Sequence, residues 1–367
     1  MNKKAVSTSL LVGVVVAFLL GIGVGYAVFY ATVTPKTVTV TTTLTATAVP
    51  TETAKPTERV HLIFGLDWAI YGRHAPYFVA VEKGFFEEEG LIVEVVRGYG
   101  SADTISRVAS GAVDIGFADF GSLIRAKAAN PDLDVKMVAV IYGKAPYTIF
   151  TLKSHGISTP KDLEGKTIGG PPGDANRVMF PAFAKLAGID ASKVNWVNIE
   201  ATAKTQMLLS HQVDAIPEYF MHKAVLEREA AKMGDEVVYF LYADYGLTVY
   251  SNGIIVKDGM LKEKPEIVKR FLRALVKAFE YTFEHPDEAV DILLKREPKL
   301  DREVARAEID IVKELVMTPE AQEHGIGYMT REKVEDSIKI VFEAFELGQP
   351  TVKPEDVYSM EFLPTKA

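Results

Sequence analysis

The sequence predicts an α/β protein with two lobes, a hinge and a helical C-terminal segment, preceded by one N-terminal transmembrane helix. From residue 58 onward, short buried strands alternate with helices of about ten residues, which is typical of βαβ units and a mainly parallel sheet. A second block of the same kind starts near Pro146. An extended segment at 248–256 then returns to the first sheet, and the rest of the chain is almost wholly helical.

The expected domain boundaries follow from this return of the chain. The first lobe takes residues 58–145 and 248–367, and the second lobe takes 146–247. Two chain crossings, near Ala145 and Leu247, form the hinge. Closure of two such lobes on a ligand between them is an established type of hinge motion.

The N-terminus predicts membrane attachment. Lys3 and Lys4 precede residues 5–31, an uncharged apolar run that is long enough to span a bilayer, with the lysines inside. A cleaved signal peptide is the alternative, although its apolar region would be about 7–15 residues and no small-x-small site follows. We expect residues 1–31 to anchor an extracytoplasmic binding domain to the cell membrane, or to release it as a secreted protein if cleaved. The threonine- and proline-rich residues 32–57 predict a linker.

The composition excludes several classes of function. The 367 residues carry a net charge of −8 with both signs interspersed, so no positive stripe is expected to bind nucleic acid. The sequence contains no cysteine, which removes disulfides, thiolate nucleophiles and cysteine metal sites. We expect no metal, because no ligand spacing is found at His155, His211, His222, His285 and His324. No cofactor is expected either.

Turn and capping residues place the elements of the first lobe. A strand at 62–66 leads through a loop at 67–73 into a helix at 76–83, with Pro76 near the first helical position and Gly84 after the last. The remaining expectations are strands at 91–96, 113–117 and 135–142, a helix capped by Ser101 and ending at Gly111, and a helix that follows the turn at 118–121 and runs to about residue 129.

The second lobe and the C-terminal segment give the same kinds of signal. Thr159 and Pro160 open a short helix, and a glycine-rich loop at 169–176 leads into a helix that reaches Gly188 with a kink at Pro181. Further strands are expected at 166–169, 194–199, 213–216 and 237–242, and helices at 201–210 and 219–233. Helices are expected in the C-terminal segment at 265–283, which is amphipathic, and at 286–295, 302–315 and 331–347.

The ligand site is expected around residues 65–91, where a strand ends in an aromatic loop and a helix begins. Open α/β sheets bind ligands in the crevice beyond the strand ends, because loop side chains and helix N–H groups point there. Trp68 and Tyr77 are the aromatic candidates of this stretch. A place in the hydrophobic core is the alternative for each of them.

Five segments resemble the substrate-binding proteins of ABC importers. They are DW at 67–68, GRHAPYFVAVEKGFFEEEGLIVEV at 72–95, GSADTISRVASGAVDIGFADFGSL at 100–123, STPKDLEGKTIGG at 158–170 and VDAIPEYF at 213–220. Within these proteins, the chain resembles the group that binds pyrimidine precursors of thiamine, with the alkanesulfonate and taurine binders as cousins. The resemblance covers nearly all of the expected folded part of the chain.

The resemblance implies a type II periplasmic-binding-protein fold with a small heteroaromatic ligand between the lobes, for which a thiamine pyrimidine precursor is the best match. The resemblance also implies that the protein is not an enzyme. The partners that it implies are the transmembrane permease subunits of an ABC importer and their ATPase. The residues that the resemblance places at the pocket, with Tyr142 and Asn252 near the hinge, are Asp67, Trp68, Tyr71, His74, Tyr77, Asp119, Phe120, Tyr142, Gly173, Asp174, Glu218, Tyr219 and Asn252.

The residue types in this set suit a flat ligand with a polar edge. An aminopyrimidine needs aromatic faces above and below its ring and a carboxylate that accepts its amino hydrogens. Asp67 or Glu218 can make the edge contact, and the candidates for the faces are Trp68, Tyr71, Tyr77, Phe120 and Tyr219. A sulfonate or another small anion is the alternative ligand; it favours arginine, hydroxyls and bare helix N-termini, and Asp174 at a helix start would repel it.

Structural roles are the alternatives for several candidates. Asp174 suits an N-cap, His74 suits a structural hydrogen bond, and Arg177 suits an ion pair as well as a ligand carboxylate or phosphate. The alternative function from another class is a pyrimidine synthase, because a related eukaryotic family makes the thiamine pyrimidine on the same fold. The family resemblance implies a cysteine-rich motif, a histidine and a pyridoxal-phosphate lysine for such an enzyme, whereas this chain has no cysteine.

Overall fold

Two five-stranded sheets organise the protein, and the computed structural model describes residues 59–365 of the chain. The first sheet has the order β2-β1-β3-β10-β4, and the second has the order β7-β6-β8-β5-β9. The strands are β1 Val60–Gly65, β2 Leu91–Val96, β3 Ile115–Asp119, β4 Val135–Val140, β5 Tyr147–Leu152, β6 Thr167–Gly169, β7 Asn195–Val197, β8 Ala215–Tyr219, β9 Val237–Leu241 and β10 Asn252–Lys257. We call each sheet with its covering helices a lobe.

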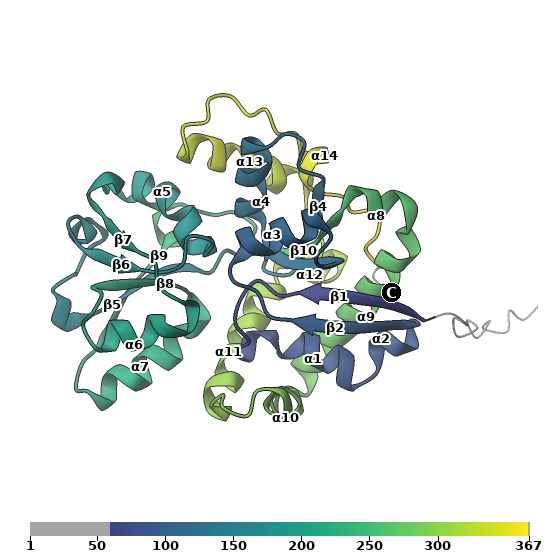
Figure 1. Ribbon diagram of the computed structural model, residues 1–367, viewed down its shortest axis with the longest axis horizontal. Helices are drawn as coiled ribbons and strands as arrows, with labels where there is room; N and C mark the ends of the chain where they lie inside the picture. The colour runs from purple at the N-terminus through teal and green to yellow at the C-terminus, as the bar shows by residue number, and fades with distance from the viewer. Residues whose placement is uncertain (1–58, 366–367) are drawn as a thin grey trace, which may run out of the picture. The chain divides into compact units, whose positions relative to one another are not determined.

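Helices cover both faces of each sheet, as Figure 1 shows. On the first sheet, α1 Ala75–Glu82, α2 Phe85–Glu88 and α9 Pro265–Glu284 lie on one face, and α3 Ser101–Ser110 and α4 Phe120–Ala129 lie on the other. On the second sheet, α5 Ala175–Ala187 lies opposite α6 Lys204–Leu209 and α7 Lys223–Lys232. The C-terminal segment adds α8 Asp258–Glu263, α10 Pro286–Arg296, α11 Arg302–Val316, α12 Pro319–His324, α13 Arg331–Ala344 and α14 Pro354–Val357.

Seven short 3₁₀ helices connect these elements within the described residues. Two of them adjoin the candidate site: η3 Gly72–His74, which leads into α1, and η8 Phe220–His222, which follows β8. The others are η4 Lys153–His155, η5 Pro160–Leu163, η6 Ala191–Lys193, η7 Ala201–Ala203 and η9 Tyr242–Tyr245.

One strand in each sheet runs against its neighbours, and the other four run in one direction, so each sheet is mainly parallel, as expected, but mixed. β10 is antiparallel to both β3 and β4, and its register places Asn252 opposite Asp119. β5 is antiparallel to both β8 and β9, and Tyr147 lies opposite Tyr219. These two strands therefore bring residues that are distant in the sequence to the ends of β3 and β8.

Acidic residues cap α4, which begins at the end of β3, and α5, which follows β6 after a short loop. Asp119 accepts a hydrogen bond from the Ser122 backbone N–H at 2.6 Å, which caps α4. Asp174 caps α5 in the same way. The prediction for Ser101 was wrong: Gly100, at φ 123°, is the N-cap of α3, and Ser101 is the first helical residue. The reason is that the Ser101 hydroxyl accepts the backbone N–H of Asp119 at 3.1 Å instead of capping its own helix.

The main core lies between the first sheet and α9. Phe64 of β1 makes edge contacts with Tyr77 and Phe271, each with ring centroids 5.2 Å apart, and Phe271 also stacks on Phe86 at 5.0 Å. Residues Phe271, Leu272, Leu275 and Phe279 of α9 are all buried, so the expected amphipathic face is the face that packs.

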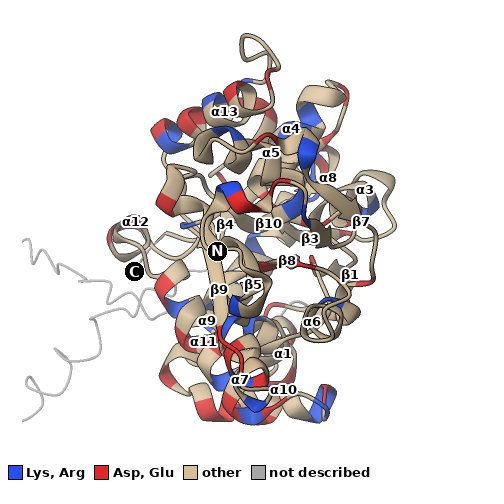
Figure 2. Ribbon diagram, turned by 90° about the vertical axis from the view of Figure 1, so that its left-hand side faces the viewer, with Lys and Arg blue, Asp and Glu red and all other residues tan. Residues whose placement is uncertain are grey.

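The outer helices carry charges of both signs. Figure 2 shows basic and acidic residues alternating along helices such as α13 and α10. Exposed ion pairs of this kind contribute only about 0–1 kcal/mol each. None of the helices within residues 59–365 combines the length and the apolar character that a membrane crossing needs. The expected anchor at 1–31 and the expected linker at 32–57 lie outside the described residues.

Gly253 tests the packing of β10 between β3 and β4. A Cβ at this position would lie 2.3 Å from the Ala139 carbonyl oxygen of β4. Gly253→Ala is therefore expected to lower the free energy of unfolding by about 1–3 kcal/mol. Gly259→Ala in α8 is the matched control, because the nearest atom to its Cβ would be 4.0 Å away. Chemical denaturation should show the loss only for Gly253→Ala; equal stability of the two variants would contradict the packing of β10 against β4.

Candidate ligand-binding site

A small cavity lies where the strand ends of the two lobes meet. Asp67, Trp68, Arg73 and Ser101 line it from the first lobe. Asp174, Ala175, Asn176, Glu218 and Tyr219 line it from the second. Its volume is about 10 Å³, which is room for about one water molecule. The two lobes are therefore in direct contact around the site.

Asp67 is the centre of the polar contacts on the first lobe. Its carboxylate accepts hydrogen bonds from Arg73 Nη2 at 3.1 Å, His74 Nε2 at 3.0 Å and Asn252 Nδ2 at 2.8 Å. Burial on its own raises the pKa of Asp67, but Arg73 and His74 outweigh burial and hold this pKa below its ordinary value. Asp67 is thus a buried, charged and fully bonded carboxylate.

His74 is a neutral partner of Asp67. The Tyr71 backbone N–H donates to His74 Nδ1 at 3.0 Å, so the ring proton lies on Nε2 and points at Asp67. Burial and the nearby Arg73 guanidinium lower the pKa of His74 to about 4. The contact between His74 and Asp67 is therefore a hydrogen bond rather than an ion pair at neutral pH, which is the structural role considered for His74 as an alternative.

Lys204 is the centre of the polar contacts on the second lobe. Its ammonium is buried, lies 2.9 Å from Asp174 Oδ2 and 2.7 Å from Glu218 Oε2, and donates to the Pro217 carbonyl oxygen at 2.5 Å. Burial opposes the charged form, yet the two carboxylates raise the pKa of Lys204 above its ordinary value. The same ammonium lies 4.4 Å above the centre of the Trp68 ring, so it occupies one aromatic face of the site.

Hydrogen bonds between the lobes close the cavity on the side of β10. The Tyr219 hydroxyl bonds to Asn252 Oδ1, and the Tyr147 hydroxyl bonds to Asp119 Oδ2. Ser251 Oγ lies between these pairs, 3.2 Å from Asp119 Oδ2 and 3.2 Å from Asn252 Oδ1. Burial raises the pKa of Asp119. The described structure is therefore a closed arrangement held by side chains of both lobes.

The site combines an excess of carboxylates with two unused donors. The three carboxylates Asp67, Asp174 and Glu218 share two cations, Arg73 and Lys204, and both cations are already paired with them. Trp68 Nε1 and Arg73 Nη1 are buried and have no hydrogen-bond partner among residues 59–365. A ligand that offers both amino hydrogens and acceptor nitrogens is complementary to this arrangement.

The structure brings most of the predicted site residues together. Five of them line the cavity, and His74, Asn252 and Asp119 belong to the hydrogen-bonded network around it. Gly173 lies against the start of α3, where its carbonyl oxygen accepts the Ala102 N–H at 3.4 Å. Tyr142 lies behind the site, with its ring centroid 6.4 Å from that of Tyr219.

Two of the predicted aromatic residues pack elsewhere. Tyr77 lies in the main core among Phe64, Phe117 and Phe279, and Phe120 is fully buried beside Tyr250. Their rings therefore offer no face to the cavity, which is the core alternative considered for Tyr77. Trp68 belongs instead to a small separate cluster with Ala69 and Ala201, against which Tyr71 packs.

Four lining residues were missed by the sequence reasoning: Arg73, Ser101, Ala175 and Asn176, and Lys204 behind them completes the network. Arg73 follows the predicted aromatic loop directly, so its position was a usable signal. Lys204 lies in a polar segment that gives no sign of burial. Arg177 makes no ion pair within residues 59–365: it donates to the Gly170 carbonyl oxygen and to Asn198 Oδ1, and it stacks on Trp196.

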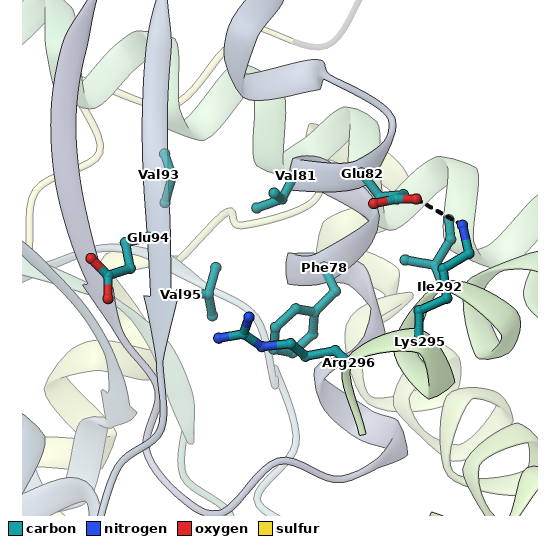
Figure 3. A pocket seen from close by; sticks show the side chains of 9 residues that line it. All are labelled: Phe78, Val81, Glu82, Val93, Glu94, Val95, Ile292, Lys295 and Arg296. Atoms are coloured by element: carbon teal, nitrogen blue, oxygen red, sulfur yellow. Dashed lines mark hydrogen bonds and ion pairs between the residues drawn. The ribbon is translucent and has the colours of Figure 1, made fainter. Parts of the chain in front are cut away.

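A wider groove on the first lobe lies apart from this site. It has a volume of about 410 Å³ and runs between α1, β2 and α10 (Figure 3). Figure 3 shows the valine and phenylalanine side chains of its floor and the pair of Lys295 with Glu82, whose atoms are 2.7 Å apart. The groove shares no residue with the cavity between the lobes. Among residues 59–365, no three acidic or histidine side chains are grouped to hold a metal ion.

The two sheets and their helices define an α/β periplasmic-binding-protein fold. The alkanesulfonate-binding protein SsuA from Xanthomonas axonopodis pv. citri, solved with MOPS, superposes with a TM-score of 0.65 at 13% identity over 83% of this chain and 100% of that chain. The aliphatic sulphonate binding protein SsuA from Escherichia coli gives a TM-score of 0.61 at 14% identity over 84% of this chain and 94% of that chain. At these identities the likeness concerns the fold alone.

The chain belongs to the NMT1/THI5-like family, whose model matches residues 72–289. It is 28% identical to a formylaminopyrimidine-binding protein of Halalkalibacterium halodurans, over 84% of this chain and 93% of the relative. It is 29% identical to the riboflavin-binding protein RibY of Chloroflexus aurantiacus, over 68% of this chain and 70% of the relative. It is also 27% identical to a 4-amino-5-hydroxymethyl-2-methylpyrimidine phosphate synthase of Legionella pneumophila, over 64% of this chain and 73% of the relative. The family membership confirms the resemblance found in the sequence.

The lowered pKa of His74 predicts a loss of stability in mild acid. The folded pKa of about 4 lies below the ordinary 6.5, so neutral His74 stabilises the fold fully above about pH 6.5 and this contribution disappears as the pH falls toward 4. The shift corresponds to roughly 3 kcal/mol. Urea denaturation between pH 7 and pH 4 should show a smaller decrease for His74→Gln than for the wild type. The exposed His324→Gln serves as the control, and equal decreases in all three proteins would contradict the assignment.

Proposed function

We propose that the protein captures a small heteroaromatic metabolite outside the cytoplasm and delivers it to the permease of an ABC importer. The observation that carries the proposal is the cavity between the lobes, where the Trp68 ring lies beside buried carboxylates and two unused donors. Family membership supports a ligand of pyrimidine type, because the relatives include a formylaminopyrimidine-binding protein and a riboflavin-binding protein. A thiamine pyrimidine precursor is the ligand that we favour.

Each group at the site has a role in this proposal. Trp68 stacks on the ligand ring, in the position where the Lys204 ammonium lies in the closed structure. Trp68 Nε1 and Arg73 Nη1 donate to acceptor nitrogens of the ring. Glu218 and Asp174, which hold Lys204, accept the amino hydrogens that the ligand brings. On binding, the amino group of the ligand replaces the Lys204 ammonium as the hydrogen-bond donor to Asp174 and Glu218.

The same charges argue against the alternative ligand, a sulfonate or another small anion. Its negative charge would enter beside Asp67, Asp174 and Glu218, while Arg73 and Lys204 are already paired with them. Asp174 also blocks the start of α5 by accepting the Asn176 N–H. Discrimination against anions follows from this excess of carboxylates.

We propose binding rather than catalysis. The family includes a pyrimidine phosphate synthase, so membership is compatible with either activity. Two observations support the binding role. The sequence has no cysteine, unlike the cysteine-rich enzymes that it resembles. The histidine at the site, His74, is committed to Asp67 and to the Tyr71 backbone and is not free to transfer protons.

Ligand entry requires the lobes to separate, because a cavity of about 10 Å³ cannot hold a pyrimidine ring. We propose lobes at 58–145 with 248–367 and at 146–247, which open about the crossings near Ala145 and Leu247. We also propose that residues 1–31 anchor the protein to the membrane and that residues 32–57 let the lobes reach the permease. The division of the strands between two sheets supports these boundaries.

A thermal-shift panel tests the proposed ligand class. Aminopyrimidines should raise the melting temperature of the protein by several degrees at 100 times their Kd, because binding to the folded state alone contributes about 2.7 kcal/mol. Alkanesulfonates and taurine should give no shift. A clear shift with a sulfonate and none with any pyrimidine would reverse the ligand choice, and turnover of a panel member would establish an enzyme instead.

Trp68→Ala tests the stacking role. Removing the indole should weaken binding of an aminopyrimidine at least about tenfold while the protein remains folded, because Trp68 lies outside the main core. Trp196→Ala is the matched control, since Trp196 packs on Phe180 and Arg177 away from the cavity. Calorimetric titration measures both variants. Loss of folding in Trp68→Ala would favour the core role, and unchanged affinity would exclude the stacking role.

A further inference from the structure

A second cavity lies beside the central one, where η3 and α11 of the first lobe face η8 and α7 of the second. Its volume is about 180 Å³, and its walls include Tyr71, His222, Val225, Val304 and Glu308. This is far larger than the central cavity, whose volume is about 10 Å³. The cavity shares no lining residue with the central site, although Tyr71 is close to Trp68 and Arg73 in the chain.

Two buried polar side chains face each other across this cavity. His222 Nδ1 is buried without a hydrogen-bond partner among residues 59–365, and it lies 3.9 Å from Glu308 Oε1. The other ring nitrogen, Nε2, is fixed by Thr205 Oγ1 at 2.9 Å. A single hydroxyl or amino group between Nδ1 and Oε1 can reach both atoms at hydrogen-bond distances of about 2.8 Å. The pair is therefore complementary to one small polar group.

The second cavity is linked to the central site by two contacts. The Tyr71 ring lies on His222, with centroids 5.4 Å apart, and also packs against the Trp68 cluster, so this one side chain is in contact with residues of both sites. Glu308 Oε2 accepts the backbone N–H of Arg73 at 3.2 Å, and the Arg73 side chain lines the central cavity. Arg73 therefore links the two sites: its backbone bonds to Glu308, and its side chain lines the cavity proposed to bind the ring.

We propose that this second cavity receives a short hydroxyl- or amino-bearing side chain of the same ligand whose ring binds at Trp68. The proposal rests on the proposed function and specifies the ligand further: a planar heteroaromatic ring that carries a chain of a few atoms ending in a hydrogen-bond donor. The Glu308 carboxylate accepts that donor and disfavours an anionic group at the same place. Val225 and Val304 provide apolar contacts for the carbon atoms of the chain.

Three matched pyrimidines test this inference by calorimetric titration of the full-length protein. They are 4-amino-2,5-dimethylpyrimidine, 4-amino-2-methyl-5-propylpyrimidine and its 3-hydroxypropyl analogue. In the wild type, the hydroxypropyl compound should bind about tenfold tighter than the propyl compound, because its hydroxyl bonds to His222 and Glu308. His222→Phe keeps a ring beside Tyr71 and should abolish that tenfold gain while the dimethyl compound binds as before.

A variant that fills the cavity gives an independent measurement. Val304→Phe should weaken both chain-bearing compounds and leave the Kd of the dimethyl compound unchanged. Glu303→Phe adds the same side chain at an exposed position of α11 and should change none of the three. If the dimethyl compound binds but the hydroxyl gives no gain, or Val304→Phe weakens all three compounds equally, the second cavity is not a subsite. If none of the compounds binds the wild type, the proposed function fails and this inference fails with it.

Discussion

One buried carboxylate organises the first lobe's side of the contact between the lobes. Asp67 receives donors from Arg73, His74 and Asn252, which come from the loop after β1 and from β10, far along the chain. Asn252 in turn bonds to Tyr219 at the end of β8, so the network continues into the second lobe. A buried carboxylate that loses a donor is costly, by several kcal/mol. The shape of the loop that carries Trp68 is therefore dictated by the requirements of a single charge.

Most of the architecture could be predicted from the sequence, because strands and helices alternate with clear turn signals and the segment at 248–256 reads as a returning strand. The errors have physical causes. β3 and β8 extend two or three residues beyond their predicted ends, to Asp119 and Tyr219, because polar residues that suggest a turn are satisfied inside the sheets by the site network. β5 was missed, because all six residues of its run YTIFTL are buried and the run lacks the alternation of a half-exposed strand.

The site was predictable only in part, because contacts between distant segments decide which side chains face the cavity. The family resemblance placed Asp174 and Glu218 at the pocket, and both line the cavity, Asp174 from the N-cap of α5 and Glu218 from the end of β8. The fold alone decides which way an aromatic ring faces, and so Tyr77 and Phe120 belong to the core whereas Trp68 belongs to the cavity. Lys204 could not be found, because a lysine is buried only where partners from other segments neutralise it.

The place of β10 also has a consequence for the order in which the chain folds during synthesis. Every strand of the second sheet lies between residues 147 and 241, so that sheet can assemble as soon as this continuous stretch is available. The first sheet lacks the strand between β3 and β4 until residue 257 has been made, although four of its strands are synthesised earlier. Pairing across such a separation carries a large loop-closure cost and is slow. β1, β2 and β3 can pair with one another at once, but β3 and β4 lack their shared neighbour until the whole second sheet has been made.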